Sequence, residues 1–156
     1  QGGIVMLQRK QTIYLFIAIV VTVIALVFPL GFYEQEGLVT GNMYNLWIIT
    51  AQDMHDMVVW PLFAIQLVTL PLAVISIFAY RNRIFQSRLC SLNILLLVGW
   101  YIVFVVYTFV FNGRYNSVFH YSLIDLLPLL SIILYFIARK GIMADEKLVR
   151  DADRIR

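Results

Sequence analysis

Four long apolar runs, separated by short polar segments, dominate the chain. They cover residues 12–32, 57–80, 89–111 and 120–139. About 20 apolar residues in a helix reach about 30 Å, which matches the hydrocarbon thickness of a bilayer. The pattern therefore predicts an all-α fold, an integral membrane four-helix bundle over residues 6–140. Pro61 and Pro71 lie inside the second run and predict a bent helix, because proline removes a helical hydrogen bond.

The segments between the runs predict how the helices are joined. Residues 81–88 contain three arginines and are expected to form a tight turn, and residues 112–116 predict a compact turn on the opposite face. The clearly apolar part of the fourth run, residues 123–138, is short for a crossing. We therefore expect residues 118–121 to extend that helix, and a helix that stands upright in the membrane is the alternative.

The first connection, residues 33–56, is acidic and contains neither lysine nor arginine. Gly37 and Gly41 lie between two mixed apolar and polar stretches, which indicates a small β-hairpin. An interfacial helix would use the same apolar residues and is the alternative.

Composition places the chain outside the soluble globular class. Apolar residues make up 62% of the sequence, charged residues 13%, and the mean hydropathy is +0.84. The net charge of +3 follows from arginines near the apolar runs and does not indicate a nucleic-acid partner. A single cysteine, Cys90, excludes an internal disulfide.

The basic residues predict the orientation. All of the 12 lysines and arginines except Arg114 fall on the face that holds both termini and residues 81–88. Basic residues near short loops stay in the cytoplasm, so both termini are expected to be cytoplasmic. We interpret residues 1–5 as a remnant of cloning ahead of a native start at Met6, and the first run as an uncleaved anchor rather than a signal peptide.

The end of the chain, residues 141–156, differs in character from the four runs. Charges of both signs alternate at helical pair spacing, beside a narrow apolar stripe of Leu148, Ala152 and Ile155. This pattern predicts a cytoplasmic charged helical tail. The stripe is suited to contact with a protein partner or with a second copy in a homo-oligomer, and a helix that is merely solvated is the alternative.

Polar residues inside the runs form the first candidate site. Gln66, Ser131 and Thr22 fall at similar depth and predict one polar layer near the middle of the bundle. Hydrogen bonds between helices are the structural explanation, and a small-solute binding or transport site is the functional one.

Two further groups of polar residues lie on the far side. Asp53, His55 and Asp56, together with His120, carry the donor types that bind zinc, but their spacing is not diagnostic, and solvated residues ahead of the second helix are the favoured explanation. Ser122 and Asp125 have the spacing of a helix capping box, and a proton site at Asp125 is the alternative.

Motifs for catalysis are missing from the sequence. It contains no nucleotide-binding glycine pattern, metalloprotease helix motif or nucleophile elbow. We therefore expect no enzymatic activity, no cofactor and no obligatory metal. The lipid bilayer is the expected partner of the helices. We predict that the protein is an interaction or scaffold component, and a solute-binding or transport component is the alternative.

Three motifs resemble those of a known family. They are Met6-Leu7-Gln8-Arg9-Lys10-Gln11-Thr12-Ile13-Tyr14-Leu15, Arg88-Leu89-Cys90 with Asn93, and Asp145-Glu146-Lys147-Leu148-Val149-Arg150-Asp151-Ala152-Asp153-Arg154-Ile155-Arg156. The chain thereby resembles an uncharacterised bacterial family of small four-span integral membrane proteins. The resemblance implies a multi-pass protein of the bacterial inner membrane and supplies no catalytic residue.

Overall fold

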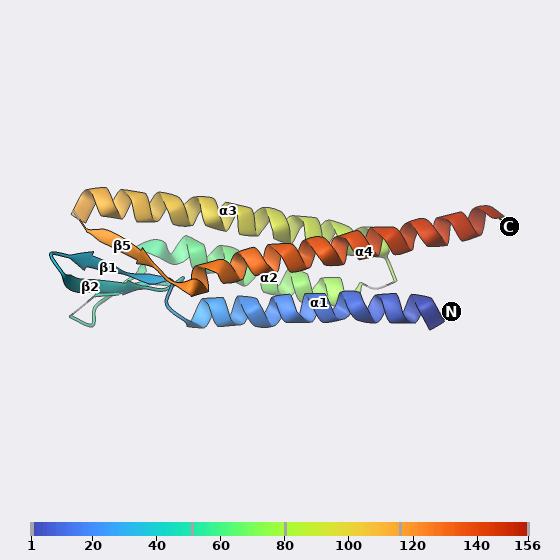
Figure 1. Cartoon of the computed structure of the whole chain (residues 1–156), viewed down its shortest axis with the longest axis horizontal. Helices are drawn as coiled ribbons and strands as arrows, with labels where there is room; N and C mark the ends of the chain where they lie inside the picture. The colour runs from blue at the N-terminus through green and yellow to red at the C-terminus, as the bar shows by residue number, and fades with distance from the viewer. Residues whose placement is uncertain (1, 51, 80, 116, 156) are drawn as a thin grey trace.

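In the computed structural model, four long helices form a bundle with a small β-sheet at one end (Figure 1). The structure describes residues 2–50, 52–79, 81–115 and 117–155. The helices are α1 (Gly2–Val27), α2 (Trp60–Phe78), α3 (Arg83–Tyr115) and α4 (Leu127–Ile155). Helix α4 packs against α1 and α3, and α2 packs against α3 and α1. Both chain ends lie at the end opposite to the sheet, so we name the two ends the termini end and the sheet end.

The sheet is antiparallel and has the strand order β4-β3-β2-β1-β5. Its strands are β1 (Gly31–Gln35), β2 (Leu38–Met43), β3 (Ile48–Thr50), β4 (His55–Asp56) and β5 (Val118–Tyr121). Glu36 and Gly37, the two residues between β1 and β2, both have positive φ angles, of 52° and 82°. This is the backbone of a tight hairpin turn, and glycine meets it without steric cost. The all-α prediction is therefore incomplete: the predicted hairpin exists within a larger sheet.

The expectation that residues 118–121 extend the fourth span is wrong, because they form β5. Phe119 is buried in the core, whereas its neighbours are exposed (Val118) and partly exposed (His120), as expected for a strand whose successive side chains point to opposite faces. The edge of β1 supplies the pairing partner. A 3₁₀ turn at Leu123–Leu126 follows, and α4 gains its length by continuing to Ile155.

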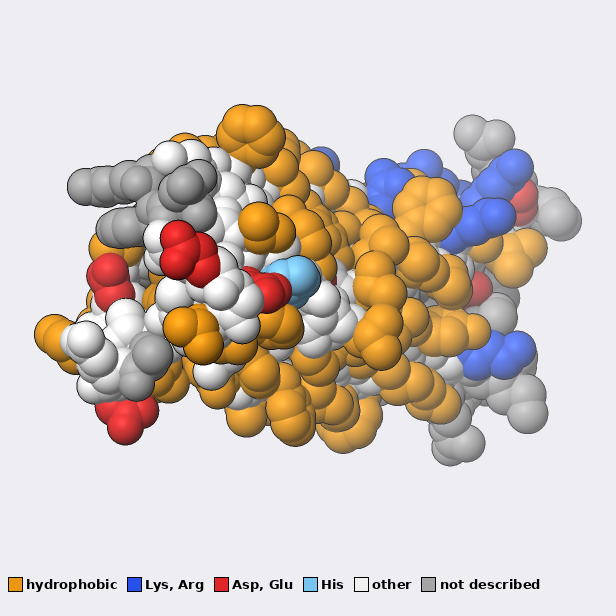
Figure 2. Space-filling view, turned by 60° about the vertical axis from the view of Figure 1, so that its left-hand side comes forward, with side chains coloured by type: hydrophobic (Ala, Val, Ile, Leu, Met, Phe, Trp, Pro, Cys, Tyr) orange, Lys and Arg blue, Asp and Glu red, His pale blue; other side chains and the backbone are white. Residues whose placement is uncertain are grey.

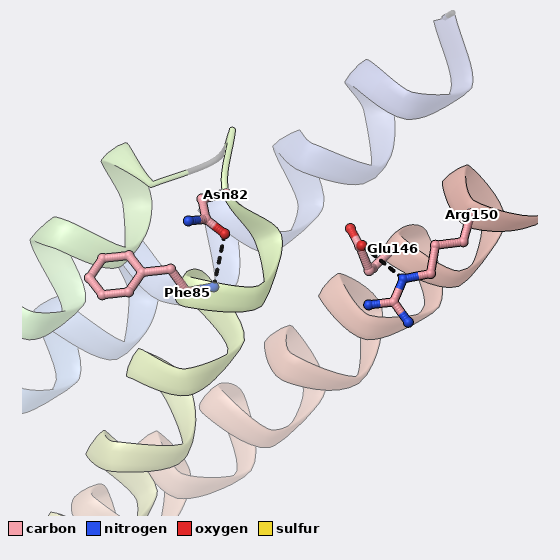
Figure 3. Close-up of polar contacts among 4 residues, drawn as sticks. All are labelled: Asn82, Phe85, Glu146 and Arg150. Carbon is pink, nitrogen blue, oxygen red and sulfur yellow. Dashed lines mark hydrogen bonds and ion pairs between the residues drawn. The ribbon is translucent and has the colours of Figure 1, made fainter. Parts of the chain in front are cut away.

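The basic turn is also shorter than expected. The Asn82 side chain accepts a hydrogen bond of 3.2 Å from the Phe85 amide, so α3 already begins at Arg83 (Figure 3). The same helix continues to Tyr115, so most of the turn predicted at residues 112–116 is helical, and Asn116 lies outside the described residues.

The ends of the first two runs differ from the prediction as well. Helix α1 ends at Val27, and Gly31 and Phe32 belong to β1. Pro61 lies in the first turn of α2, where its missing N–H group is tolerated, and Pro71 lies inside the helix. A 3₁₀ turn, Met57–Val59, precedes α2.

The buried side chains form two apolar clusters along the bundle. The cluster at the sheet end contains Leu30, Tyr33, Met43, Val59, Leu62, Trp100, Phe104, Phe111 and Phe119. The cluster toward the termini end contains Leu15, Ala18, Ala73, Cys90, Leu97, Tyr135, Ala138 and Ile142. Along α2, Gln66 falls between the residues that contribute to the two clusters.

The prediction of four long apolar helices is confirmed. Segments within Lys10–Val27, Met57–Phe78, Arg83–Gly113 and Leu123–Asp153 are long and apolar enough to cross a membrane. Figure 2 shows a broad belt of apolar side chains around the bundle, with acidic side chains on the sheet end and basic ones gathered at the termini end. A polar cap at either side of an apolar belt is the surface expected of a membrane protein.

Candidate functional site

The sheet end contains a cavity of about 250 Å³ between the sheet and the end of α3. It is lined by Tyr33, Gln35, Thr40, Gly41, Ile48, Thr50, Asp56, Phe111 and Ser117. Tyr33 pairs with Gly41 and Gly41 with Thr50, so residues of three adjacent strands present one face to the cavity. Asp56 joins them because it pairs with Ile48 on the next strand.

The cavity combines aromatic and polar walls. Tyr33 and Phe111 contact each other edge to face, with ring centroids 6.4 Å apart. Burial, and to a smaller extent the neighbouring Tyr121, raises the pKa of Tyr33, so its hydroxyl stays protonated at neutral pH. Asp56 is the one charged side chain among the described lining residues, and its Oδ1 accepts a hydrogen bond of 3.1 Å from the Val58 amide.

The residues predicted as weak metal ligands are not brought together. His55 lies on β4 and His120 on β5, the two edges of the five-stranded sheet, and four strand spacings of about 4.8 Å separate these edges. His55 contacts the Trp47 ring, whereas His120 stacks on Phe32 and its Nε2 lies 2.5 Å from a Glu34 carboxylate oxygen. Among the described residues, no group of three or more histidine, cysteine, aspartate or glutamate side chains could hold a metal ion.

The predicted polar layer is assembled in part. Thr22 and Ser131 are buried, and their hydroxyl oxygens lie 3.5 Å apart between α1 and α4. Gln66 on α2 is fully buried, and neither its Nε2 nor its Oε1 has a hydrogen-bond partner among the described residues. A buried amide without hydrogen bonds lowers the stability of the folded protein unless a ligand or another polar group binds it.

Substitution of Gln66 should therefore reveal whether its amide has a structural role. We expect Gln66→Leu to raise the free energy of unfolding by about 1 kcal/mol, because it removes a buried polar group without breaking a described hydrogen bond. Gln86→Leu is the matched control. Gln86 is equally buried, but its Nε2 donates 2.8 Å to the Ser76 carbonyl, so this variant should be destabilised by about 1–2 kcal/mol. Melting in detergent measures both, and a destabilised Gln66→Leu protein would contradict the expectation.

Ser122 and Asp125 form a capping box at the start of the 3₁₀ turn before α4. Ser122 Oγ accepts from the Ile124 amide at 3.3 Å, and Asp125 Oδ2 accepts from the Ser122 amide at 3.2 Å. The Tyr101 hydroxyl supports the same junction, since it accepts from the Leu129 amide at 2.8 Å and donates to the Asp125 carbonyl at 2.5 Å. Asp125 thus has a local structural explanation.

Asn45 is a buried polar residue that the sequence reasoning missed. Its Nδ2 donates 2.8 Å to the Ala25 carbonyl, and its Oδ1 accepts 2.8 Å from Trp100 Nε1. Its own carbonyl accepts from the Phe63 amide at 3.2 Å. Asn45 therefore joins the first connection to α1, α2 and α3, and its sequence context of mixed polar and apolar residues carries no signal of that role.

The predicted tail is not a separate helix. It is the last part of α4, which continues through Asp145 to Ile155. Gln11 Nε2 donates 2.6 Å to Asp145 Oδ2, and both side chains are buried. This bond joins two of the three motifs that carried the family resemblance. Leu148 is 61% exposed and Ala152 is exposed, whereas the side chain of Ile155 lies outside the described residues.

These features define a class of protein: a small bundle of four membrane-length helices that carries a β-sheet at the end opposite to its termini. The chain belongs to the family described as a domain of unknown function (DUF4293), which matches residues 7–155. The predicted resemblance is thereby confirmed over nearly the whole chain. The comparison with curated proteins gives no match.

Proposed function

We propose that this chain is a non-enzymatic, multi-pass protein of the bacterial inner membrane, with both termini in the cytoplasm, that acts as an interaction component. Four membrane-length helices support the insertion, and the gathering of basic side chains at the termini end supports the orientation (Figure 2). The observation that carries the interaction role is the projecting end of α4.

Helix α4 continues past the other helices at the termini end (Figure 1). Beyond Asp145, which is buried, the residues of its apolar stripe that the structure describes are exposed. Glu146 and Arg150 lie one turn apart and form an ion pair of 3.2 Å (Figure 3). Such a pair on a surface adds only about 0.3–0.5 kcal/mol to the helix. The exposure of Leu148 and Ala152 leaves the extension available for contact.

A second copy of the chain is the partner that the tail composition fits best. Residues 145–156 contain four acidic residues (Asp145, Glu146, Asp151, Asp153) and four basic ones (Lys147, Arg150, Arg154, Arg156), a net charge of zero. Two tails therefore do not repel each other as whole segments. Pairing would cover the stripe that begins at Leu148.

Cysteine crosslinking of the purified full chain in detergent tests this proposal. In a Cys90→Ser background, Ala152→Cys should form a disulfide-linked dimer on mild oxidation, and a further Leu148→Glu substitution should abolish it. Lys147→Cys is the matched control, because at about 100° per residue it points about 140° away from Ala152 on the helix. Equal crosslinking at both positions, or a monomer throughout, would overturn the tail as a self-interaction surface.

Deletion of the tail must respect the contact between Gln11 and Asp145. Removal of residues 147–156 keeps this buried hydrogen bond, whereas a deletion from residue 145 would break it and disturb the bundle. We expect the shorter deletion to abolish dimer formation while the melting temperature stays unchanged.

A second candidate function is a small-solute binding or transport component with a polar site between the helices. The unsatisfied amide of Gln66 favours it. A small solute that raised the melting temperature of the wild-type protein but not that of the Gln66→Leu variant would support this function.

A further inference from the structure

We propose that the cavity at the sheet end binds a small organic cation, an ammonium group that carries a few apolar carbons. This site is independent of the tail and of the polar layer between the helices. Three features of its lining support this ligand class: one carboxylate, an aromatic wall and hydrogen-bond acceptors.

The charge of the cavity selects for a cation. Asp56 lines it, and the described lining residues include no lysine, arginine or histidine. The first connection also holds Glu34, Glu36 and Asp53 without a basic residue, so this connection adds negative potential around the cavity. An anion would find no positively charged partner among these residues.

The aromatic wall favours an organic cation over a metal ion. Tyr33 and Phe111 are each only 5% exposed and border the same cavity as the carboxylate. Aromatic rings beside a carboxylate attract alkylammonium groups through their π electrons and cover the apolar carbons. A calcium ion requires six to eight oxygen ligands, far more than one carboxylate and a few hydroxyls provide.

Ser117 adds a buried hydroxyl to the lining. Its residue is 6% exposed and borders the cavity. Thr50 and Thr40 add two hydroxyls, although Thr50 Oγ1 accepts from the Met54 amide and Thr40 Oγ1 donates to the Tyr33 carbonyl. A ligand with N–H or O–H donors can therefore bond to several sides of the cavity.

Choline and its uncharged isostere 3,3-dimethylbutan-1-ol are suitable probes, because they differ in the positive charge and share their shape. Binding to the purified full chain in detergent is measured by calorimetry, with the melting temperature as a second readout. We expect choline to bind at least tenfold more tightly than the isostere, and higher salt to weaken its binding.

Two variants distinguish the site from general surface charge. Asp56→Asn keeps an oxygen to accept from the Val58 amide and should weaken choline binding at least tenfold. Asp53→Asn removes an acid of the same connection that does not line the cavity, and asparagine tolerates the φ of 59° at this position. This variant should change choline binding less than twofold.

Three results with these probes and variants would overturn the proposal. They are the absence of choline binding, equal binding of choline and the isostere, and equal losses in the two variants. Tighter binding of glucose than of choline would also overturn it, because it would identify the cavity as a site for neutral polyols.

Discussion

Replacement of Asn45 with alanine should lower the free energy of unfolding by about 3 kcal/mol. The variant leaves two buried groups without partners, the Trp100 indole N–H and the Ala25 carbonyl. Each such group costs about 1–3 kcal/mol when it is removed from water and left unpaired. The loss would loosen the first connection from α1 and α3 at the same time.

Asn42→Ala is the control for Asn45→Ala. Asn42 is exposed on β2 of the same connection, so its replacement should change the unfolding free energy by no more than about 0.5 kcal/mol. Melting in detergent compares the two variants. In a Trp100→Phe background the cost of Asn45→Ala should fall, because the indole donor is already absent. An Asn45→Ala protein that melts like wild type would refute the proposed role of this residue.

A second large effect is expected at Gly31, where β1 passes close to β5. A Cβ atom on Gly31 would overlap the His120 carbonyl oxygen and would lie 2.6 Å from Phe119 Cζ. The carbonyl belongs to the backbone of the paired strand, so it moves only if the register between β1 and β5 is lost. We therefore expect Gly31→Ala to cost about 3 kcal/mol or more.

Gly99→Ala is the matched control for Gly31→Ala. Gly99 lies inside α3, and apart from its chain neighbours and the nearby backbone of α3, a Cβ atom there would meet no atom within 4 Å. Alanine is the better helix former, so this variant should be neutral or more stable by about 0.5–1 kcal/mol. Amide hydrogen exchange of β5 should accelerate in the Gly31 variant and stay unchanged in the Gly99 variant. Protected β5 amides in Gly31→Ala would contradict the overlap argument.

The capping box and the four helices show what local sequence can predict. Ser122 and Asp125 are three residues apart, and their bonds form within one turn of chain, so their spacing alone reveals the cap. A membrane-length helix likewise satisfies all its backbone hydrogen bonds within one apolar run. These features need no knowledge of the rest of the fold.

Strand β5 shows why part of the same sequence was misread. Residues 118–121 join an apolar run and have no local feature that excludes a helix. They become a strand because β1, far away in the chain, offers an unpaired edge at the point where α3 ends. Helix bounds at Arg83 and Tyr115 were missed for a related reason, since packing carries helices beyond their apolar cores.

The candidate site was predicted even less completely than the fold. Asp56 was singled out, but as a metal ligand beside His55 and His120. The alternation of a strand sends neighbouring residues to opposite faces, so Asp56 lines the cavity whereas His55 pairs with Ile49 and contacts Trp47. Tyr33 reaches that cavity from strand β1, Phe111 from the end of α3 and Ser117 from the residue just before β5, and no spacing in the sequence connects them.

The sequence by itself determined the four membrane-length helices, the separation of basic and acidic ends and the family. Each of these depends on composition or on contacts between near neighbours along the chain. Only the tertiary structure decided the five-stranded sheet, the cavity, the Asn45 contacts and the bond between Gln11 and Asp145. These features join segments that are distant in sequence, so no pattern of near neighbours along the chain specifies them.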